Sequence, residues 1–299
     1  MSYSEDRLAV KMKGKWGFID SLGATVVSPR YSCVFSFHEG VARCVEGEED
    51  ELVVFVGMDG EVLFRPPKCS RADVPQRDFH DGLAAISDNG RWGYMNRAGE
   101  WVIPPRFDSA GDFSEGLAPI ATSGAAGFVD QAGSPHLHGK FLWCWPFSEG
   151  LAAVEFEKDL CGYIDRAGQV VVPAQFPRAR DFVSGRALVM NMSGDWCYID
   201  RRGAIVIPPV FVYANDFSEG RAAVTYHYGG DFGYIDADGN KVIEDQFGTA
   251  DQFSHGLALV EKSAGRGTRL YIDRGGRIVW QGRQVPFPDD DLVMPDEAE

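Results

Sequence analysis

The stretch "WGFID" at residues 16–20 is followed by a glycine at position 23, and close variants of this pattern recur along the chain. Taking the tryptophan position as an anchor gives eight copies, separated by 34 to 39 residues. A repeat of this length is typical of solenoids, propellers and other repeat arrays. The anchor positions are Trp16, Val53, Trp92, Ala126, Cys161, Trp196, Phe232 and Arg269.

Two positions after the anchor, every copy has an aromatic residue, and seven positions after it every copy has a glycine. The glycine follows a "DxxG" segment, in which Asp can accept a backbone hydrogen bond and Gly supplies a positive φ, so we expect a tight turn. The copies that fit the pattern best place this structural turn glycine at Gly23, Gly99, Gly168, Gly203 and Gly239. The remaining copies place it at Gly60, Gly133 and Gly276.

The modules of one repeat predict strands. "LAAV" before the anchor and "WGYID" at it are short, β-rich and separated by a few polar residues, which indicates an antiparallel hairpin. A third strand, "VIPP", follows the turn, and the linking segment, such as 107–113, supplies a short fourth strand that restores the chain direction. No window has a helical period. We therefore expect an all-β protein of eight tandem antiparallel repeats.

Four strands in about 36 residues are typical of a propeller blade, and the small residues of "LAA" suit the crowded axis of a propeller. The chain begins and ends at whole repeats, so we do not expect a blade made from both ends to close a ring. An open, curved array of the same repeats is therefore the alternative architecture.

The unit "WGYIDxxGxxVIPPxFxxAxxFSEGLAxV" resembles the WG (KWG) repeat family of bacterial proteins, over roughly residues 7–281. The resemblance implies a β-rich repeat scaffold that binds other proteins. It implies no shared reaction and therefore no catalytic residue. Repeat 4 departs from the pattern, because "SPHLHGKFLWCW" replaces its proline strand, and we expect that strand to be missing.

The charge of the chain is concentrated in two places. The net charge is −15, but the runs 46–51 and 288–299 hold eleven acidic residues and no Lys or Arg. We divide the chain into a lead at 1–6, a repeat domain at 7–287 and an acidic tail at 288–299. The absence of a basic stripe disfavours nucleic-acid binding. No apolar run is long enough to span a membrane, and no signal peptide is evident, so we expect a cytoplasmic protein with reduced cysteines.

No motif indicates a cofactor, a metal site or a catalytic nucleophile. The "YID" aspartates precede turn glycines, which favours turn capping over metal binding. We expect the acids of the "FSEG" segments to be solvated linker residues. We expect His38, His80 and His255, which lie in different repeats, to be far apart. His136 and His138 share a face only if "HLH" is extended, and two imidazoles make an incomplete metal site.

Functional residues of a regular scaffold usually lie where the repeat is broken. Three segments depart from it: the acidic run 46–51, the insertion 68–78 and the segment 136–147. Surface aromatic residues are typical binding anchors, and acids around them attract a basic partner. The candidate binding residues are Trp143, Trp145, His136, His138, Glu48, Glu49 and Asp50. The alternative for the tryptophans is that they fill the place of the missing strand in repeat 4.

These features together predict a non-catalytic scaffold that binds a protein partner, and the acidic segments favour a basic one. The alternative from a different class is a carbohydrate-binding or carbohydrate-active module that uses tryptophans and carboxylates. The sequence leaves the oligomeric state and the identity of the partner open.

Overall fold

The computed structural model describes residues 7–47, 52–67, 77–263 and 268–282. All regular structure in these ranges is β-strand, which confirms the all-β class. None of the described residues belongs to a helix that could span a membrane. The chain divides into two compact units: the N-terminal unit ends at Lys140, and the C-terminal unit begins at Phe141.

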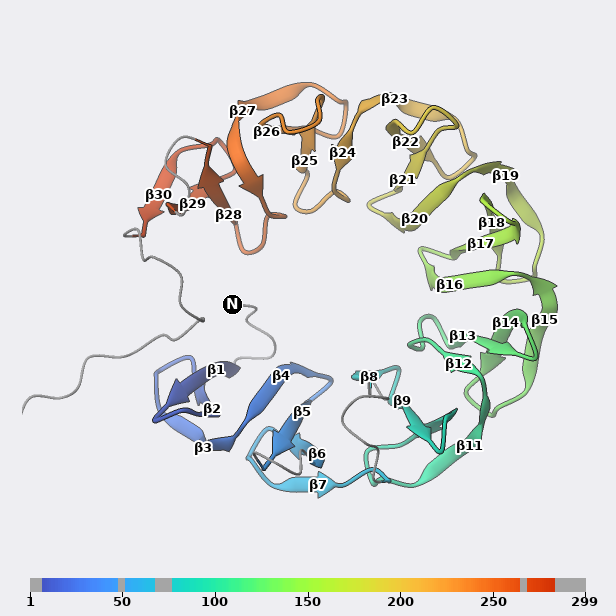
Figure 1. The fold of residues 1–299 in the computed structure, drawn as a ribbon, viewed down its shortest axis with the longest axis vertical. Helices are drawn as coiled ribbons and strands as arrows, with labels where there is room; N and C mark the ends of the chain where they lie inside the picture. The colour runs from blue at the N-terminus through green and yellow to red at the C-terminus, as the bar shows by residue number, and fades with distance from the viewer. Residues whose placement is uncertain (1–6, 48–51, 68–76, 264–267, 283–299) are drawn as a thin grey trace, which may run out of the picture. The chain divides into compact units, whose positions relative to one another are not determined.

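Consecutive strands pair antiparallel in chain order, so each repeat forms one meandering sheet (Figure 1). Among the described residues, β1–β3 form a three-stranded sheet, and five four-stranded sheets follow, from β4–β7 to β20–β23. Strands β24–β30 form a seven-stranded sheet that holds repeats 7 and 8, because the long strand β27 belongs to both.

Strands at equivalent positions in the repeats have similar bounds. The short first strands are β4 (Cys33–His38), β8 (Phe79–His80), β12 (Ser109–Ala110), β16 (Trp143–Ser148), β20 (Arg178–Val183) and β24 (Tyr213–Ala214). The second strands are β1 (Arg7–Met12), β5 (Val41–Glu46), β9 (Leu83–Asp88), β13 (Leu117–Thr122), β17 (Leu151–Glu157), β21 (Arg186–Met190), β25 (Ala222–Thr225) and β28 (Leu257–Lys262).

The third strands carry the WG motif, and the fourth strands carry the prolines. The third strands are β2 (Lys15–Asp20), β6 (Leu52–Gly57), β10 (Arg91–Met95), β14 (Ala125–Asp130), β18 (Leu160–Asp165), β22 (Trp196–Asp200), β26 (Phe232–Ile235) and β29 (Arg269–Asp273). The fourth strands are β3 (Thr25–Tyr31), β7 (Val62–Phe64), β11 (Trp101–Phe107), β15 (Pro135–Phe141), β19 (Val170–Phe176), β23 (Ile205–Phe211), β27 (Lys241–Ala250) and β30 (Ile278–Gln281).

The short strand expected after the prolines is confirmed, and it begins the next sheet. Strand β12, for example, pairs with β13 through Ala110 and Ile120. The "LAAV" strand is therefore the second strand of its sheet. From its small residues we had expected it to be the innermost strand, and this expectation is wrong. The side chains of the strand are small and aliphatic because both of its faces are buried against neighbouring sheets. A strand in this position has apolar residues at nearly every position instead of at every second one.

The prediction that repeat 4 lacks its proline strand is wrong. Strand β15 (Pro135–Phe141) forms in its place and has seven residues, as β11 and β19 do. Eight residues separate Gly133 from Phe141, the same spacing as between Gly168 and Phe176, so the repeat stays in phase. The segment 136–147 is consequently no insertion, and Trp143 begins a regular first strand.

In several repeats the glycine of the WG pair lies against a bulge in the fourth strand, although Cys197 stands at this position beside the equally bulged strand β23. In sheet β8–β11, Tyr94 lies opposite Ile103 and Trp92 lies opposite Phe107. A step of two residues along β10 therefore corresponds to a step of four residues along β11. The bulged backbone, which includes two prolines, lies close to β10. A Cβ atom on Gly93 would lie 2.4 Å from the carbonyl oxygen of Ile103, which is a collision. The same collision would occur at Gly17, Gly162 and Gly233. Glycine is therefore selected here by backbone proximity.

The "DxxG" segments form the expected turns. In the turn that begins at Asp200, the Asp200 carboxylate accepts hydrogen bonds from the backbone N–H groups of Arg202 and Ala204, at 2.8 and 2.9 Å. All eight turn glycines have φ between +76° and +85°. Most also touch the preceding sheet: a Cβ on Gly203 would lie 2.8 Å from Cγ1 of Val172, in β19. The turn thus also serves as a contact between sheets.

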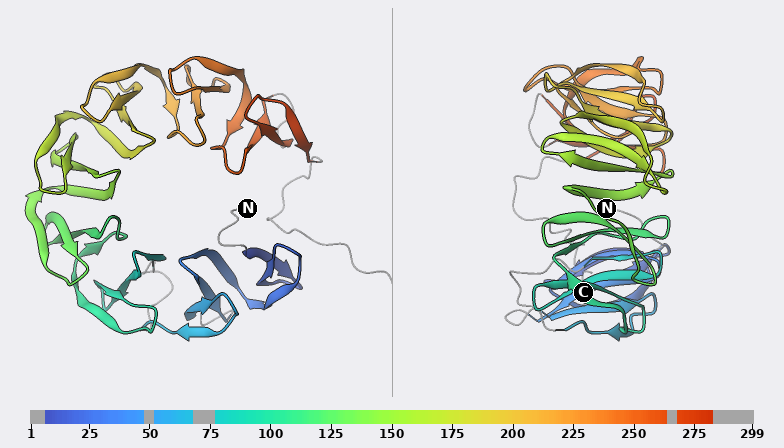
Figure 2. Two further views of the ribbon diagram at one scale, coloured as in Figure 1. Left: turned by 180° about the vertical axis from the view of Figure 1, so that it is seen from behind. Right: turned by 90° about the vertical axis from the view of Figure 1, so that its right-hand side faces the viewer.

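Successive sheets pack face to face within each unit (Figures 1 and 2). Strand β21 illustrates the arrangement, because Ala187 and Val189 belong to the core cluster shared with sheet β16–β19, while Leu188 belongs to the cluster shared with β24–β27. The tyrosine of the third strand links the same pair of sheets, since the Tyr198 hydroxyl donates to the Asn215 carbonyl at 2.6 Å. The same bond recurs from Tyr94 to Gly111, from Tyr163 to Arg180 and from Tyr234 to Asp251.

We had predicted that the acids of the "FSEG" segments are solvated linker residues. Some of them instead make specific hydrogen bonds to the next repeat. Glu219 has φ +50° and accepts hydrogen bonds from the Gly256 N–H at 2.9 Å and from Arg274 Nη2 at 2.7 Å. The Arg274 guanidinium holds the pKa of Glu219 below its usual range. Glu39 makes the equivalent bonds to Gly82 and Arg97. These carboxylates join their turns to the following repeat, a contact that the sequence of a single repeat does not reveal.

A buried acid lies on the first strand of sheet β20–β23. Oδ1 of Asp181 is buried and has no hydrogen-bond partner among the residues that the structure describes. Burial, together with the charge of Asp216, raises the pKa of Asp181 to about 6. Asp216 itself is paired with Arg180 at 3.4 Å. The ionised form of Asp181 is therefore stabilised less in the folded protein than in water.

Two of the turn glycines provide a matched test of the contact between sheets. Gly23 and Gly203 have φ of +85° and +81°, but a Cβ on Gly23 would meet no atom within 4 Å. We expect Gly23→Ala to lower the free energy of unfolding by about 1 kcal/mol through backbone strain alone. Gly203→Ala adds a clash with the stiff side chain of Val172 and should cost about 2 kcal/mol or more. Guanidinium unfolding measures both, and equal losses would show that the contact with Val172 is unimportant.

Asp181 predicts a pH-dependent stability. An acid whose pKa is higher in the folded than in the unfolded state binds more protons when folded, so it destabilises the protein as pH rises from about 4 to about 6, and the loss persists at higher pH. Asp181→Asn should therefore raise the free energy of unfolding at pH 7.5 by about 2 kcal/mol, and by much less at pH 4. Urea unfolding at the two pH values measures this difference. An equal effect at both would mean that ionisation of Asp181 is not its cause.

Candidate functional site

Trp143 begins the first strand of its sheet and lies at the surface of the C-terminal unit. Its side chain is 46% exposed, and the preceding residue, Leu142, is also exposed. In the ladder with β17, Trp143 stands opposite Glu155, and the exposed residues Glu157 and Asp159 lie in the adjoining hairpin. The strand thus presents an indole ring beside acidic side chains.

Trp145 has a different role from Trp143. It is half-buried and packs against the core cluster between sheets β16–β19 and β20–β23, which includes Ala153 and Phe182. Cys144 between the two tryptophans is buried, and burial raises the pKa of its thiol well above the usual range. Of the two predicted anchors, Trp143 is therefore the one that offers a large exposed surface.

A second aromatic residue occupies the position equivalent to Trp143. Tyr213 begins β24, four residues before Phe217, just as Trp143 lies four residues before Phe147. It is 51% exposed, and its ring centroid lies 6.1 Å from that of Tyr228, which is 81% exposed. Alignment of the eight repeats at this position would have identified Tyr213, which the search for broken repeats missed.

The other predicted binding residues are described only in part. His136 lies on β15 and is half-buried. His138 lies on the same strand, but Leu137 between them has φ +54°, so "HLH" is not regularly extended. Glu48, Glu49 and Asp50 lie outside the described residues.

Two histidines that we had expected to be far apart are neighbours. The rings of His38 and His80 lie 5.5 Å apart, because the "FSEG" turns of successive sheets are adjacent. Nε2 of His38 also lies 3.8 Å from a carboxylate oxygen of Asp78. No group of three or more His, Cys, Asp or Glu side chains within the described ranges is arranged to hold a metal ion.

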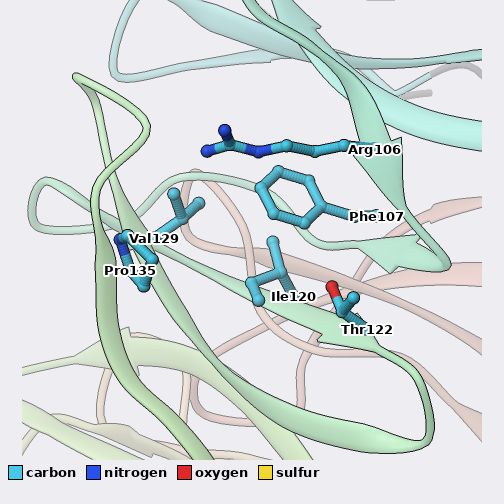
Figure 3. Close-up of a pocket in the computed structure, with 6 residues that line it drawn as sticks. All are labelled: Arg106, Phe107, Ile120, Thr122, Val129 and Pro135. Carbon is cyan, nitrogen blue, oxygen red and sulfur yellow. The ribbon is translucent and has the colours of Figure 1, made fainter.

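The N-terminal unit contains a cavity of about 330 Å³ (Figure 3). Figure 3 shows Arg106 extending above the ring of Phe107, with Ile120 and Thr122 on one side and Val129 and Pro135 on the other. The walls come from β11, β13, β14 and β15, so two successive sheets form it. The cavity was not predicted from the sequence, because the residues that line it come from two neighbouring repeats.

Comparison with solved structures supports a propeller-like fold. The chain is similar to a crystal structure of the eukaryotic initiation factor, with a TM-score of 0.64 and 12% identity over 93% of this chain and 85% of that one. It is also similar to the computationally designed Ika8 protein, with a TM-score of 0.54 and 12% identity over 93% of both chains. At such identities the likeness concerns the fold alone. No curated protein matches the sequence.

The family comparison is more specific. The model of the WG containing repeat matches residues 16–47, 92–124, 127–158, 162–191, 196–227 and 232–263, which together exceed half of the chain. Each of these segments includes the aromatic residue of the third strand and the turn glycine that follows, and four of the six include the tryptophan position itself. The chain therefore belongs to the WG repeat family.

Proposed function

We propose that the chain is a non-catalytic β-repeat scaffold that binds a protein partner through its C-terminal unit. The surface carrying this role, here called the aromatic surface, consists of Leu142, Trp143, Tyr213 and Tyr228. The observation that supports it most is the exposure of Trp143 and Tyr213 at the same position of two repeats. Neither ring is needed to complete a core cluster, so both remain available for contact.

The residue types of the aromatic surface favour a protein partner. Trp and Tyr are enriched among the residues that dominate binding energy at protein interfaces, because they bury a large area at a low entropic cost. Arg178 occupies the equivalent position in the intervening sheet and adds a hydrogen-bonding group between them. Such a mixture of aromatic and polar groups is typical of non-obligate interfaces.

The charges near Trp143 favour a basic partner. Glu155 stands opposite Trp143 in the ladder, and Glu157 and Asp159 lie in the hairpin that follows. Acids at the rim of an interface act mainly on the rate of association with a positively charged partner and on its dependence on salt. The aromatic rings would then supply affinity, and the acids would supply long-range attraction.

The experiment is affinity capture from the source cell with the wild-type protein and with the double variant Trp143→Ala, Tyr213→Ala. The partner should be lost from the double variant, since removal of such anchors costs about 2 kcal/mol or more each. Ile205→Ala is the matched control, because Ile205 is exposed to a similar degree but lies on a fourth strand. It should capture the partner as the wild type does.

Equal melting temperatures of the three proteins would exclude unfolding as the cause of any loss. With the captured partner purified, Glu155→Gln with Glu157→Gln should slow association and weaken its salt dependence. Full capture by the double variant would place the binding surface elsewhere. Binding to a glycan array that depends on Trp143, without a captured protein, would favour the carbohydrate-binding alternative instead.

A further inference from the structure

The cavity of the N-terminal unit lies at a position where two other repeats place an aromatic ring. In those two repeats, the aromatic residue that ends a fourth strand contacts another aromatic residue fifteen positions later, on or directly after the second strand of the following sheet. These pairs are Phe141 with Phe156, whose ring centroids lie 5.5 Å apart, and Phe211 with Tyr226, at 5.2 Å. The residue fifteen positions after Phe107 is Thr122, which is not aromatic, as Glu46, Asn191 and Lys262 at the same position of other repeats are not. Beside Phe107 the cavity occupies the space that a ring fills next to Phe141 and Phe211.

The remaining walls suit an aromatic ring. Ile120, Val129 and Pro135 are apolar, and Phe107 contributes the part of its ring that lines the cavity, so a ligand ring could contact it edge-to-face, a geometry that aromatic pairs prefer. The volume of about 330 Å³ is at the lower end of the range for small-molecule sites, about 300–1,000 Å³. The cavity therefore suits a ligand with one ring and a short side chain.

Arg106 gives the cavity a charge preference. Its guanidinium lies 5.0 Å from the centroid of the Phe107 ring and donates a hydrogen bond to the Gly133 carbonyl. Arg106 makes no ion pair with any residue that the structure describes, whereas Arg91 nearby is paired with Asp108. A positive charge held over an apolar cavity without a carboxylate partner favours an anionic ligand group, and the planar guanidinium matches a carboxylate.

We infer that this cavity is a binding site for a small aromatic carboxylate. The ring enters beside Phe107, in the place that Phe156 and Tyr226 fill in their own sheets, and the carboxylate pairs with Arg106 at the rim. The site is independent of the aromatic surface, because every residue that lines it belongs to the N-terminal unit.

Titration with 3-phenylpropionate, followed by ligand-observed NMR and calorimetry, tests the site on the full chain. The neutral analogue 3-phenylpropanol should bind about tenfold more weakly, because it lacks the charge-assisted pair with Arg106. Arg106→Gln should weaken binding of the acid to the level of the alcohol and leave the alcohol unchanged.

Substitutions at Thr122 test the location. Thr122→Phe restores the side chain found in sheet β16–β19 and should abolish binding while keeping or raising the melting temperature, since it fills the cavity. Thr122→Val keeps the volume of threonine and should bind 3-phenylpropionate as the wild type does. Thr122→Leu fills the cavity in part and replaces Thr122→Phe if that variant does not fold.

Three results would overturn the inference. The first is no binding of 3-phenylpropionate at millimolar concentration, and the second is undiminished binding by the folded Thr122→Phe or Thr122→Leu variant. The third is equal affinity for acid and alcohol in the wild type, which would remove the role of Arg106.

Discussion

The structure depends on one constraint: no sheet can bury its two apolar faces except against its neighbours. In β21, alternate residues face opposite directions, so Val189 contributes to one core cluster and Leu188 to the next. Repeat proteins of this kind obtain their stability from nearest-neighbour interfaces as much as from the repeats themselves. The hydrogen bond from Tyr198 to the Asn215 carbonyl and the carboxylate bonds of Glu219 lie across these same interfaces. The aromatic position two residues after the anchor is kept in all eight repeats, and at Tyr198 it is a position that contacts the next sheet.

Much of the fold could be predicted because those contacts impose local rules that one repeat displays. The aromatic and glycine positions that follow the anchor predicted the hairpin and the turn, since a positive φ favours glycine in any context. Apart from the fourth strand of repeat 4, what failed depended on contacts between repeats. The sequence of one repeat does not say whether a linking strand closes its own sheet or opens the next, and so the position of the "LAAV" strand was wrong. The bonds of Glu39 and the proximity of His38 to His80 were missed for the same reason.

The candidate sites were only partly predictable. Trp143 was identified as an aromatic residue outside the aromatic positions of the repeat, although the segment that contains it proved to be a regular strand. The reason for its exposure is its position at the start of a first strand, which also exposes Tyr213. The cavity beside Phe107 could not be found in any single repeat, because it requires comparing residues fifteen positions apart across a repeat boundary. Aligning Thr122 with Phe156 and Tyr226 supplies that signal once the pairing is known.

Both candidate sites lie at positions where the scaffold tolerates a change of side-chain size. Backbone proximity fixes Gly93 and close packing between sheets constrains Gly203, so substitutions there damage the stack. Positions at the ends of strands have one neighbour fewer, and a change of side-chain size there alters the surface while the interface between sheets stays intact. A large residue at such a position is exposed, as at Trp143, and a small one can line a cavity, as at Thr122. A scaffold of this design can acquire separate binding sites in different repeats, because each substitution is confined to the pair of sheets that it touches.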